Sequence, residues 1–278
     1  MMLRAALAVG AWLFSASAAA GGDCRGASSP EQSVAELNQM GAKLFASERP
    51  REAAEYLRRS LQLNPRQQAV AKLLGLSCQL ANDPEGAEGA FRRAIEIHSR
   101  DGEPWFYLGR LYYEQNFFDQ AREALHASLE LNSRDHRPHY CLALTLEAEG
   151  QTDASEAEYG EAIRWNQKRE KPDAGPHLSY GVLLTKLGRL EEGEKQLLLA
   201  EKLQPGGWQP CFELGKLYYR KGDLKSAEQQ LTAALQNGAA GPQDQARVCH
   251  LLARVYIDLG RDADAERVLA EMRGKAHR

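Results

Sequence analysis

The chain has 278 residues, of which 43% are hydrophobic and 26% are charged, and its 35 basic and 38 acidic residues give a net charge of −3. This slightly acidic balance argues against a general nucleic-acid-binding protein. After the first twenty residues no apolar stretch reaches 18 residues, so the sequence predicts no membrane-spanning helix beyond that point.

Residues 1–20 have the layout of a secretory signal peptide. Arg4 precedes an apolar run at 5–14, and only serine and alanine follow up to Ala20. Ala18 and Ala20 satisfy the small-x-small rule for cleavage after Ala20, with cleavage after Ala18 as the alternative. The sequence therefore predicts an exported protein, periplasmic or extracellular. An uncleaved leader that tethers the chain to a membrane is the alternative, although the apolar run is short for a spanning helix.

A short connecting segment follows the predicted leader. Residues 21–29 are rich in glycine and serine and are predicted to form a flexible spacer. Ser29 is the expected N-cap of the first helix, with Pro30 in its first turn.

From Val34 onward a block of about 34 residues recurs seven times. Each block carries a small residue in its first half and a second small residue twelve positions later. The first small residues are Gly41, Gly75, Gly109, Ala143, Gly181, Gly215 and Ala253, and the second are Ala53, Ala87, Ala121, Ser155, Gly193, Ala227 and Ala265. Antiparallel helices approach closely only where both lack bulk, so each pair marks the crossing of two helices in a hairpin.

Large apolar residues surround these crossings with helical spacing. In the second half of the blocks they are Leu57, Phe91, Leu125, Tyr159, Leu197, Leu231 and Leu269. The sequence thus predicts an all-α chain of seven hairpins and fourteen helices over 30–273, followed by a short tail at 274–278. The repeats are placed near 34–67, 68–101, 102–135, 136–169, 174–207, 208–241 and 246–273.

The third repeat stands close to a known repeat pattern of W, L, G, Y, A and F. The matching residues are Trp105, Leu108, Gly109, Tyr112, Ala121 and Leu125, and Pro65 and Pro205 match the closing proline. On these residues the chain resembles the tetratricopeptide repeat family. The resemblance implies a right-handed α-solenoid that binds ligands along the inner face of its first helices, and it leaves the subfamily open.

The repeat spacing lengthens from 34 to 38 residues in two places. The insertions lie near 167–173 and 237–244, each after a second helix. They predict longer loops or an extra helical turn.

Five cysteines in an exported chain raise the question of disulfide bonds. Cys78, Cys141, Cys211 and Cys249 all fall within predicted first helices. Cys211 and Cys249 occupy equivalent positions of adjacent repeats, whose helix axes are expected about 8–10 Å apart, whereas a disulfide needs Cα atoms within about 7 Å. We therefore predict buried thiols that pack as small apolar residues, and only Cys24, in the spacer, is placed to react freely.

The sequence offers little for catalysis or metal binding. His136, His139 and Cys141 form the one weak metal candidate, but ordinary polar residues at a helix start are the favoured interpretation, and no carboxylate pairing is evident. The chain has no GxSxG, HExxH, CxxC or glycine-rich phosphate loop. We expect no enzyme, no cofactor and no metal site.

By the family resemblance, the inner face of the first helices forms a groove. Its expected lining is Lys72, Phe106, Arg110, Tyr113, Tyr140, Leu144, Glu147, Leu178, Val182, Lys186, Phe212, Lys216, Tyr219, Arg220, His250 and Arg254. The paired lysine and asparagine residues with which chaperone-binding members hold a terminal carboxylate are not reproduced at these positions. Within the lining, the predicted partner-binding residues are Arg110, Tyr113, Tyr140, Lys186, Phe212, Lys216, Tyr219, Arg220, His250 and Arg254.

Charge at the inner positions suggests the chemistry of the partner. Eight basic residues (Lys72, Arg110, Arg137, Lys186, Lys216, Arg220, Arg247 and Arg254) face four acidic ones (Glu103, Glu114, Glu147 and Asp258). We therefore expect the groove to bind a protein or peptide segment with apolar and acidic residues, mainly through repeats five to seven. The alternative is that the aromatic residues pack between helices while the basic residues are solvated.

A second functional class stays open. The chain could be a structural subunit of an envelope or secretion assembly that uses its ends and convex surface. Val268 and Met272 lie near the last expected hairpin, where a polar cap is normal, so fraying or end-to-end self-association is also expected.

Overall fold

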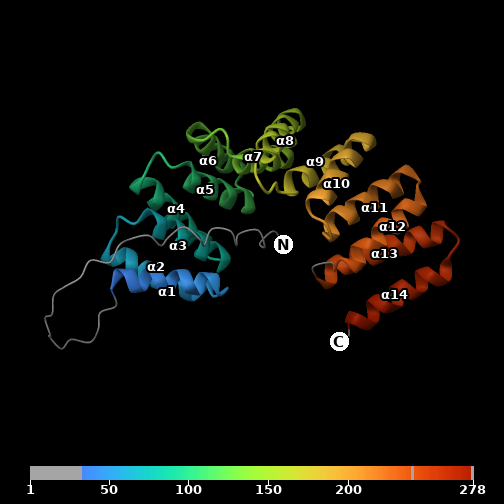
Figure 1. Ribbon diagram of the computed structural model, residues 1–278, viewed down its shortest axis with the longest axis horizontal. Coiled ribbons are helices and arrows are strands. Elements are labelled where there is room, and N and C mark those ends of the chain that lie inside the picture. The colour runs from blue at the N-terminus through green and yellow to red at the C-terminus, as the bar shows by residue number, and fades with distance from the viewer. Residues whose placement is uncertain (1–32, 239–240, 277–278) are drawn as a thin grey trace. The chain divides into compact units, whose positions relative to one another are not determined.

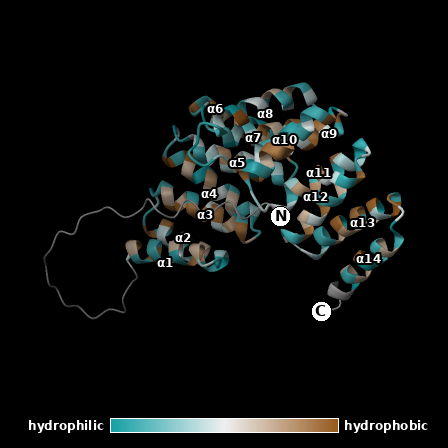
Figure 2. Cartoon of the chain, turned by 45° about the vertical axis from the view of Figure 1, so that its right-hand side comes forward, coloured by the Kyte–Doolittle hydropathy of each residue, from teal (hydrophilic) through white to brown (hydrophobic). Residues whose placement is uncertain are grey.

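The computed structural model describes residues 33–238 and 241–276, and the predicted leader, spacer and Cys24 lie outside these ranges. Within them the chain is an all-α repeat solenoid of fourteen helices with no strand, as predicted (Figure 1). Hydrophobic and hydrophilic residues alternate along the helices, which shows that they are amphipathic (Figure 2). None of the described helices is both long and apolar enough to cross a membrane.

The described residues divide into two compact units, one that ends at Ser133 and one that begins at Arg134. The first unit contains α1 (Val34–Ala46), α2 (Pro50–Leu63), α3 (Gln68–Leu80), α4 (Pro84–Ile97), α5 (Gly102–Glu114) and α6 (Phe118–Leu131). The second contains α7 (His136–Ala148), α8 (Thr152–Asn166), α9 (Gly175–Lys186), α10 (Leu190–Leu203), α11 (Trp208–Lys221), α12 (Leu224–Gln236), α13 (Pro242–Asp258) and α14 (Asp262–Ala276). In each unit consecutive helices pair as hairpins, and each hairpin packs on the next.

The small residues lie where the helices of a hairpin cross, as the repeat pattern predicts. A Cβ added to Gly109 would come within 2.7 Å of Leu125, and one added to Gly215 would come within 2.7 Å of Leu231. Both leucines are fully buried. Ser155, a polar member of the second small set, is also fully buried, and its hydroxyl donates to the Ala143 carbonyl at 2.8 Å. The small residues therefore admit the large apolar residue of the facing helix.

Tyrosine–glutamate hydrogen bonds join neighbouring hairpins inside the units. The Tyr112 hydroxyl donates to Glu88 at 2.9 Å in the first unit. In the second unit the Tyr218 hydroxyl donates to Glu194, also at 2.9 Å. Burial and this acceptor raise the pKa of Tyr218 to about 12. These bonds join α4 to α5 and α10 to α11, in each case a second helix to the first helix of the following repeat.

The first helix begins later than predicted. Its N-cap is Ser33, not Ser29, because Ser33 and Glu36 form a reciprocal capping box. The Glu36 amide donates to the Ser33 hydroxyl at 3.2 Å, and the Ser33 amide donates to the Glu36 carboxylate at 2.9 Å. The capping-box pattern accepts glutamate or glutamine three residues after the serine, so Ser29 with Gln32 fits it as well as Ser33 with Glu36, and the pattern alone does not choose between them.

The two insertions have different structures. After α8 the chain forms a loop at 167–174 that the buried Asn166 closes, since its carboxamide donates to the Asp173 carbonyl at 2.6 Å and accepts from the Asp173 amide at 2.9 Å. After α12 most of the extra length enters α13, which has 17 residues whereas α11 has 14. Both expected outcomes, a longer loop and an extra turn, therefore occur.

In three consecutive hairpins of the second unit, the second helix carries a polar residue at the same repeat position: Glu158, Gln196 and Gln230. In the first two hairpins a histidine of the first helix lies next to it. His139 Nδ1 lies 2.7 Å from Glu158 Oε2, and His177 Nδ1 lies 2.7 Å from Gln196 Oε1. In the next hairpin Cys211 stands in place of the histidine, and the buried Oε1 of Gln230 has no hydrogen-bond partner among the described residues. A buried acceptor without a donor is destabilising.

We expect Cys211→His to raise the free energy of unfolding by about 1 kcal/mol, because an imidazole at this position gives Gln230 a donor. The same substitution in a Gln230→Met background should give no gain. Urea denaturation followed by circular dichroism measures both. Equal effects in the two backgrounds would show that the pairing is irrelevant.

The four described cysteines are buried thiols, as predicted. Burial raises the pKa of Cys78 to about 11 and that of Cys211 to about 11. Both thiols are therefore protonated and poorly nucleophilic near neutral pH.

We expect reducing agent to leave the melting temperature unchanged, because none of these thiols takes part in a disulfide. Thermal denaturation with and without reductant provides the measurement. A large fall on reduction would indicate a stabilising bridge.

Candidate functional site

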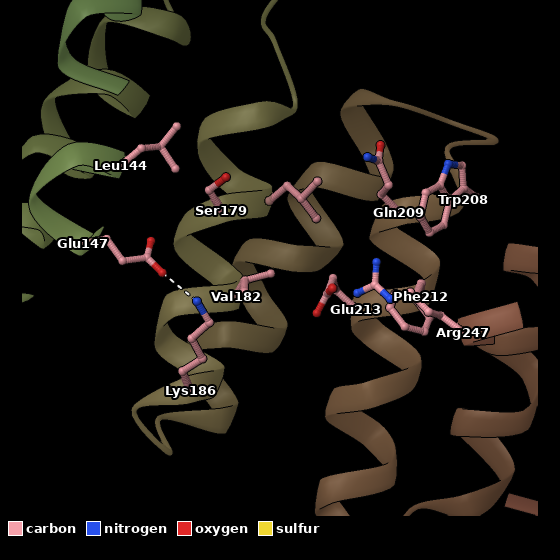
Figure 3. Close-up of a pocket in the computed structure, with 11 residues that line it drawn as sticks. Leu144, Glu147, Ser179, Val182, Lys186, Trp208, Gln209, Phe212, Glu213 and Arg247 are labelled. Atoms are coloured by element: carbon pink, nitrogen blue, oxygen red, sulfur yellow. Dashed lines mark hydrogen bonds and ion pairs between the residues drawn. The ribbon is translucent and has the colours of Figure 1, made fainter. Parts of the chain in front are cut away.

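A cavity of about 280 Å³ lies in the second unit, on the inner side of its first helices (Figure 3). Most of its lining comes from three consecutive first helices, α7, α9 and α11, and one residue comes from α13. The lining residues are Leu144, Glu147, Leu178, Ser179, Val182, Lys186, Trp208, Gln209, Phe212, Glu213 and Arg247.

Besides the Trp208 ring at the start of α11, four apolar side chains give the cavity its hydrophobic surface: Leu144, Leu178, Val182 and Phe212. They occupy the inner positions of their helices, offset from the small residues that face the second helices. Phe212 is 5% exposed and belongs to the core cluster shared by α11, α12 and α13, whereas the other three are partly exposed. The cavity is thus an opening onto the apolar interior of the unit.

Charged side chains border this surface as ion pairs. Lys186 Nζ lies 2.7 Å from Glu147 Oε1, and Glu147 Oε2 also accepts a hydrogen bond from the Tyr159 hydroxyl at 2.8 Å. Lys216 Nζ lies 2.6 Å from Glu213 Oε2. Each lysine therefore has a carboxylate partner within the protein.

The Phe212 ring lies next to two cations. Lys216 Nζ is 5.4 Å and Arg247 Cζ is 5.2 Å from its centroid. The Arg247 side chain remains 60% exposed, and its ion pair with Asp244 on the same helix is long, at 3.4 Å. Arg247 therefore carries positive charge to the edge of the cavity while it packs on the ring.

A second arginine–aromatic pair lies seven residues further along α11 and α13. Arg254 Cζ is 5.5 Å from the Tyr219 ring centroid. The Tyr219 hydroxyl donates to Asp258 at 2.7 Å, and this bond raises the pKa of Tyr219. His250, between the two arginines on α13, is exposed.

The remaining predicted residues fall in different surroundings. The Arg220 guanidinium donates to the Thr185 carbonyl at 2.6 Å, which joins α11 to α9. Tyr140 does not line the cavity itself, but its hydroxyl lies 2.8 Å from the Ser179 hydroxyl, which does.

Arg110 and Tyr113 belong to the first unit, on α5. Arg110 Nη2 donates to Gln79 at 2.8 Å, and the guanidinium packs near the Phe106 and Tyr107 rings. The Tyr113 ring lies 6.3 Å from that of Phe118.

The predicted excess of positive charge on the inner face was too large. The sequence count omitted four carboxylates that the structure places beside the basic groups. These pairs are Lys72 with Asp101 at 3.1 Å, Arg137 with Asp135 at 2.7 Å, Lys216 with Glu213 at 2.6 Å and Arg247 with Asp244 at 3.4 Å. Positive charge without a carboxylate partner among the described residues is therefore local, and in the second unit it includes Arg220 and Arg254.

Sequence reasoning missed four lining residues: Ser179, Trp208, Gln209 and Glu213. Gln209 occupies the same repeat position as Arg247, so the repeat register alone identifies it as an inner residue. Trp208 is the first residue of α11, and its ring lies 6.1 Å from that of Phe212. A tryptophan at a helix start gave no comparable signal.

The histidines at the start of α7 do have carboxylate neighbours, contrary to the sequence interpretation. His136 Nδ1 lies 3.6 Å from Asp135, and the buried His139 faces Glu158. Burial, with the nearby Arg169 guanidinium, lowers the pKa of His136. Among the residues that the structure describes, no three His, Cys, Asp or Glu side chains are grouped to hold a metal ion.

Comparison with known proteins identifies the repeat. Tetratricopeptide repeat models match residues 39–102, 79–144 and 209–237. No curated protein sequence matches the chain.

Similar solved structures include a chain of the APC/C heterotetramer Cut9–Hcn1, at 19% identity with a TM-score of 0.61, over 87% of this chain and 46% of that one. PilW, a type IV pilus biogenesis factor, is 17% identical with a TM-score of 0.65, over 74% of this chain and 92% of its own. PilF of Pseudomonas aeruginosa is 17% identical with a TM-score of 0.63, over 77% and 95%. The chain spans about half of the Cut9–Hcn1 chain that it matches. At these identities the likeness to the solved structures concerns the fold alone. The three repeat matches identify the chain as a member of the tetratricopeptide repeat family, whose fold suggests a scaffold for protein–protein interaction.

Proposed function

We propose that the second unit binds a short segment of a partner protein along the inner side of α7, α9, α11 and α13. The observation that carries this proposal is the cavity itself, because side chains from consecutive first helices meet there over an apolar surface. An apolar side chain of the partner would enter between Leu178, Val182 and Phe212, as anchors do in protein interfaces.

The polar border of the cavity supports a peptide ligand. Gln209 makes no side-chain hydrogen bond to another described residue, so its carboxamide has both a donor and an acceptor to offer to a peptide backbone. The ion pairs of Lys186 and Lys216 are already formed and need no rearrangement. Such a surface takes a mixed apolar and polar segment better than a purely charged one.

The proposed role is binding without catalysis. The side chains around the cavity are apolar groups, ion pairs, one serine and one carboxamide. The Ser179 hydroxyl is hydrogen-bonded to Tyr140, and the described lining holds no histidine that would activate it. Proteins of this repeat family generally act as scaffolds.

We further propose that the protein is exported, on the strength of the leader-like segment at 1–20. Amino-terminal sequencing of the protein recovered from the exported fraction tests this directly. A first residue of Gly21, or of Ala19 for the alternative cleavage site, is expected. Recovery only with Met1 intact would favour a tethering leader or no export.

The binding proposal is tested with a display library of random peptides selected against the purified protein. Selected peptides are then titrated by fluorescence anisotropy against wild type, Val182→Arg and Leu198→Arg. Val182 lines the cavity, whereas Leu198 is a 42% exposed leucine on α10 of the same hairpin, outside the lining. We expect Val182→Arg to weaken binding at least about tenfold, because a charge enters the apolar opening, and Leu198→Arg to leave it unchanged.

The opposite pattern of binding in these two variants would contradict the groove proposal. Loss of binding in Leu198→Arg with full binding in Val182→Arg would assign recognition to the outer surface. That result would support the alternative of a structural subunit that joins an assembly through its convex side. Circular dichroism of both variants establishes that the substitutions leave the fold intact.

A further inference from the structure

Two arginine–aromatic pairs join α13 to α11, Arg247 with Phe212 and Arg254 with Tyr219, and the first of them lines the cavity. We infer that Arg247 and Arg254 recognise two acidic side chains of the bound segment, about 10 Å apart, a separation that follows from the helical rise. This inference rests on the proposed function, since it concerns the same inner surface of the second unit.

The two pairs are regularly spaced. Arg247 lies over Phe212 at 5.2 Å, and Arg254 lies over Tyr219 at 5.5 Å. Both the arginines on α13 and the aromatic residues on α11 are seven positions apart, which is about 10 Å along a helix at 1.5 Å per residue. Two guanidinium groups are therefore presented at a defined separation.

Stacking on a ring prepares each guanidinium for a carboxylate. A cation over an aromatic face is held by the ring quadrupole and loses part of its rotational freedom before any ligand arrives. The N–H groups at the edge of the planar guanidinium stay available for the bidentate geometry that carboxylates prefer. Both Arg247 and Arg254 are exposed, so a ligand can reach them.

The carboxylates of the protein itself leave these two arginines largely unsatisfied. Arg254 forms no ion pair with a described residue, and the nearby Asp258 accepts instead from the Tyr219 hydroxyl at 2.7 Å. Arg247 has only the long contact of 3.4 Å with Asp244. Lys186 and Lys216 differ, because each has a carboxylate within 2.7 Å.

The groups around the two arginines favour an acidic peptide as the occupant. A segment in the polyproline II conformation has three residues per turn and advances about 3.1 Å per residue, so acidic residues three positions apart lie on one side of it, about 9 Å apart, close to the separation of the arginines. The apolar cavity adjoins Arg247, so the same peptide can place an apolar side chain there. The mixed surface and the net charge of −3 disfavour a polyphosphate backbone.

The experiment uses fluorescein-labelled peptides of about twelve residues, each with one leucine and two aspartates in a serine and alanine background. The aspartates are spaced by one, three or five positions. Binding is measured by anisotropy for wild type, Arg247→Gln, Arg254→Gln and Arg267→Gln. Arg267, on α14, is an exposed arginine already paired with Asp264 at 2.6 Å and serves as the matched control.

We expect the three-position spacing to bind tightest, and Arg247→Gln and Arg254→Gln each to weaken it about tenfold. Arg267→Gln should have no effect. The preference for spacing should vanish in Arg254→Gln, because only one guanidinium then remains to be matched.

Other outcomes overturn the inference in distinguishable ways. If Val182→Arg abolishes peptide binding while both arginine variants bind normally, the groove stands and the acidic recognition is wrong. If none of these substitutions matters, the groove proposal fails as well. If an oligothymidylate of similar length competes as well as the aspartate peptide, the arginines attract anions in general and the assignment to a peptide is wrong.

Discussion

Gly75→Leu is expected to destabilise the first unit by about 3 kcal/mol, since overpacking of this kind forces shifts in both helices. A Cβ built at Gly75 would come within 2.3 Å of Phe91, whose ring is fully buried. That ring is stacked on Tyr107 with the centroids 5.5 Å apart, so it cannot move aside without disturbing the next hairpin.

The matched control lies in the same hairpin. A Cβ added to Gly89, on α4, would meet nothing from the facing helices within 4 Å, and the residue is exposed. Leucine favours a helix over glycine by about 0.5–1 kcal/mol, so Gly89→Leu should raise the urea midpoint slightly. The urea midpoints of both variants are measured by circular dichroism. A similar small change in the two midpoints would mean that the helix crossing tolerates a large side chain at Gly75.

Phe212→Ala is expected to cost about 3 kcal/mol of stability, because removing the ring leaves a void in the core. The side chain is 5% exposed and packs in the cluster that includes Leu231 and Leu252. The substitution also takes away the face on which Arg247 and Lys216 rest. Any loss of partner binding in this variant therefore combines a folding effect with a recognition effect.

Lys216→Glu provides the comparison in the same helix. The Lys216 side chain is 39% exposed, and a partly exposed ion pair contributes less than about 1 kcal/mol. Its melting transition should therefore stay near that of wild type. An unchanged melting transition in Phe212→Ala would contradict the structural role of the ring. Phe212 would then contribute to partner binding and not to stability.

The fold was predictable because helix crossings constrain the residue type strongly. Gly109 and Leu125 occupy positions where one residue must be small and the other large, and this requirement recurs in each repeat. Local repetition of such pairs was sufficient to predict seven hairpins. The start of α1 was predicted at Ser29 because Pro30 follows it, whereas the structure forms the capping box between Ser33 and Glu36.

The polar detail was less predictable, since it depends on contacts between different helices. The pairing of Lys186 with Glu147 joins residues 39 positions apart, and that separation includes one of the insertions. The Gln230 acceptor also lacks a partner because Cys211 stands where the two preceding hairpins have a histidine. That consequence depends on a contact between two helices, so the sequence alone did not reveal it. Charges counted along the sequence therefore overstated the positive character of the inner face.

The candidate site was predictable in position but not in composition. Phe212 and Lys186 were identified from their place in the repeat and do line the cavity. Trp208 was not, because it is the first residue of α11 and gave no repeat signal. Gln209 was overlooked although it has the same repeat position as Arg247. Whether the predicted residues bind a partner stays a prediction.

Photo-crosslinking from single positions tests the central claim most directly. A photoreactive benzophenone amino acid is placed at Val182 in one protein and at Leu198 in another, and each is expressed in the native host and irradiated. We predict a crosslinked partner from position 182, competed by the selected peptide, and none from position 198. A crosslinked partner from position 198 alone would contradict binding in the groove and assign the interaction to the outer surface.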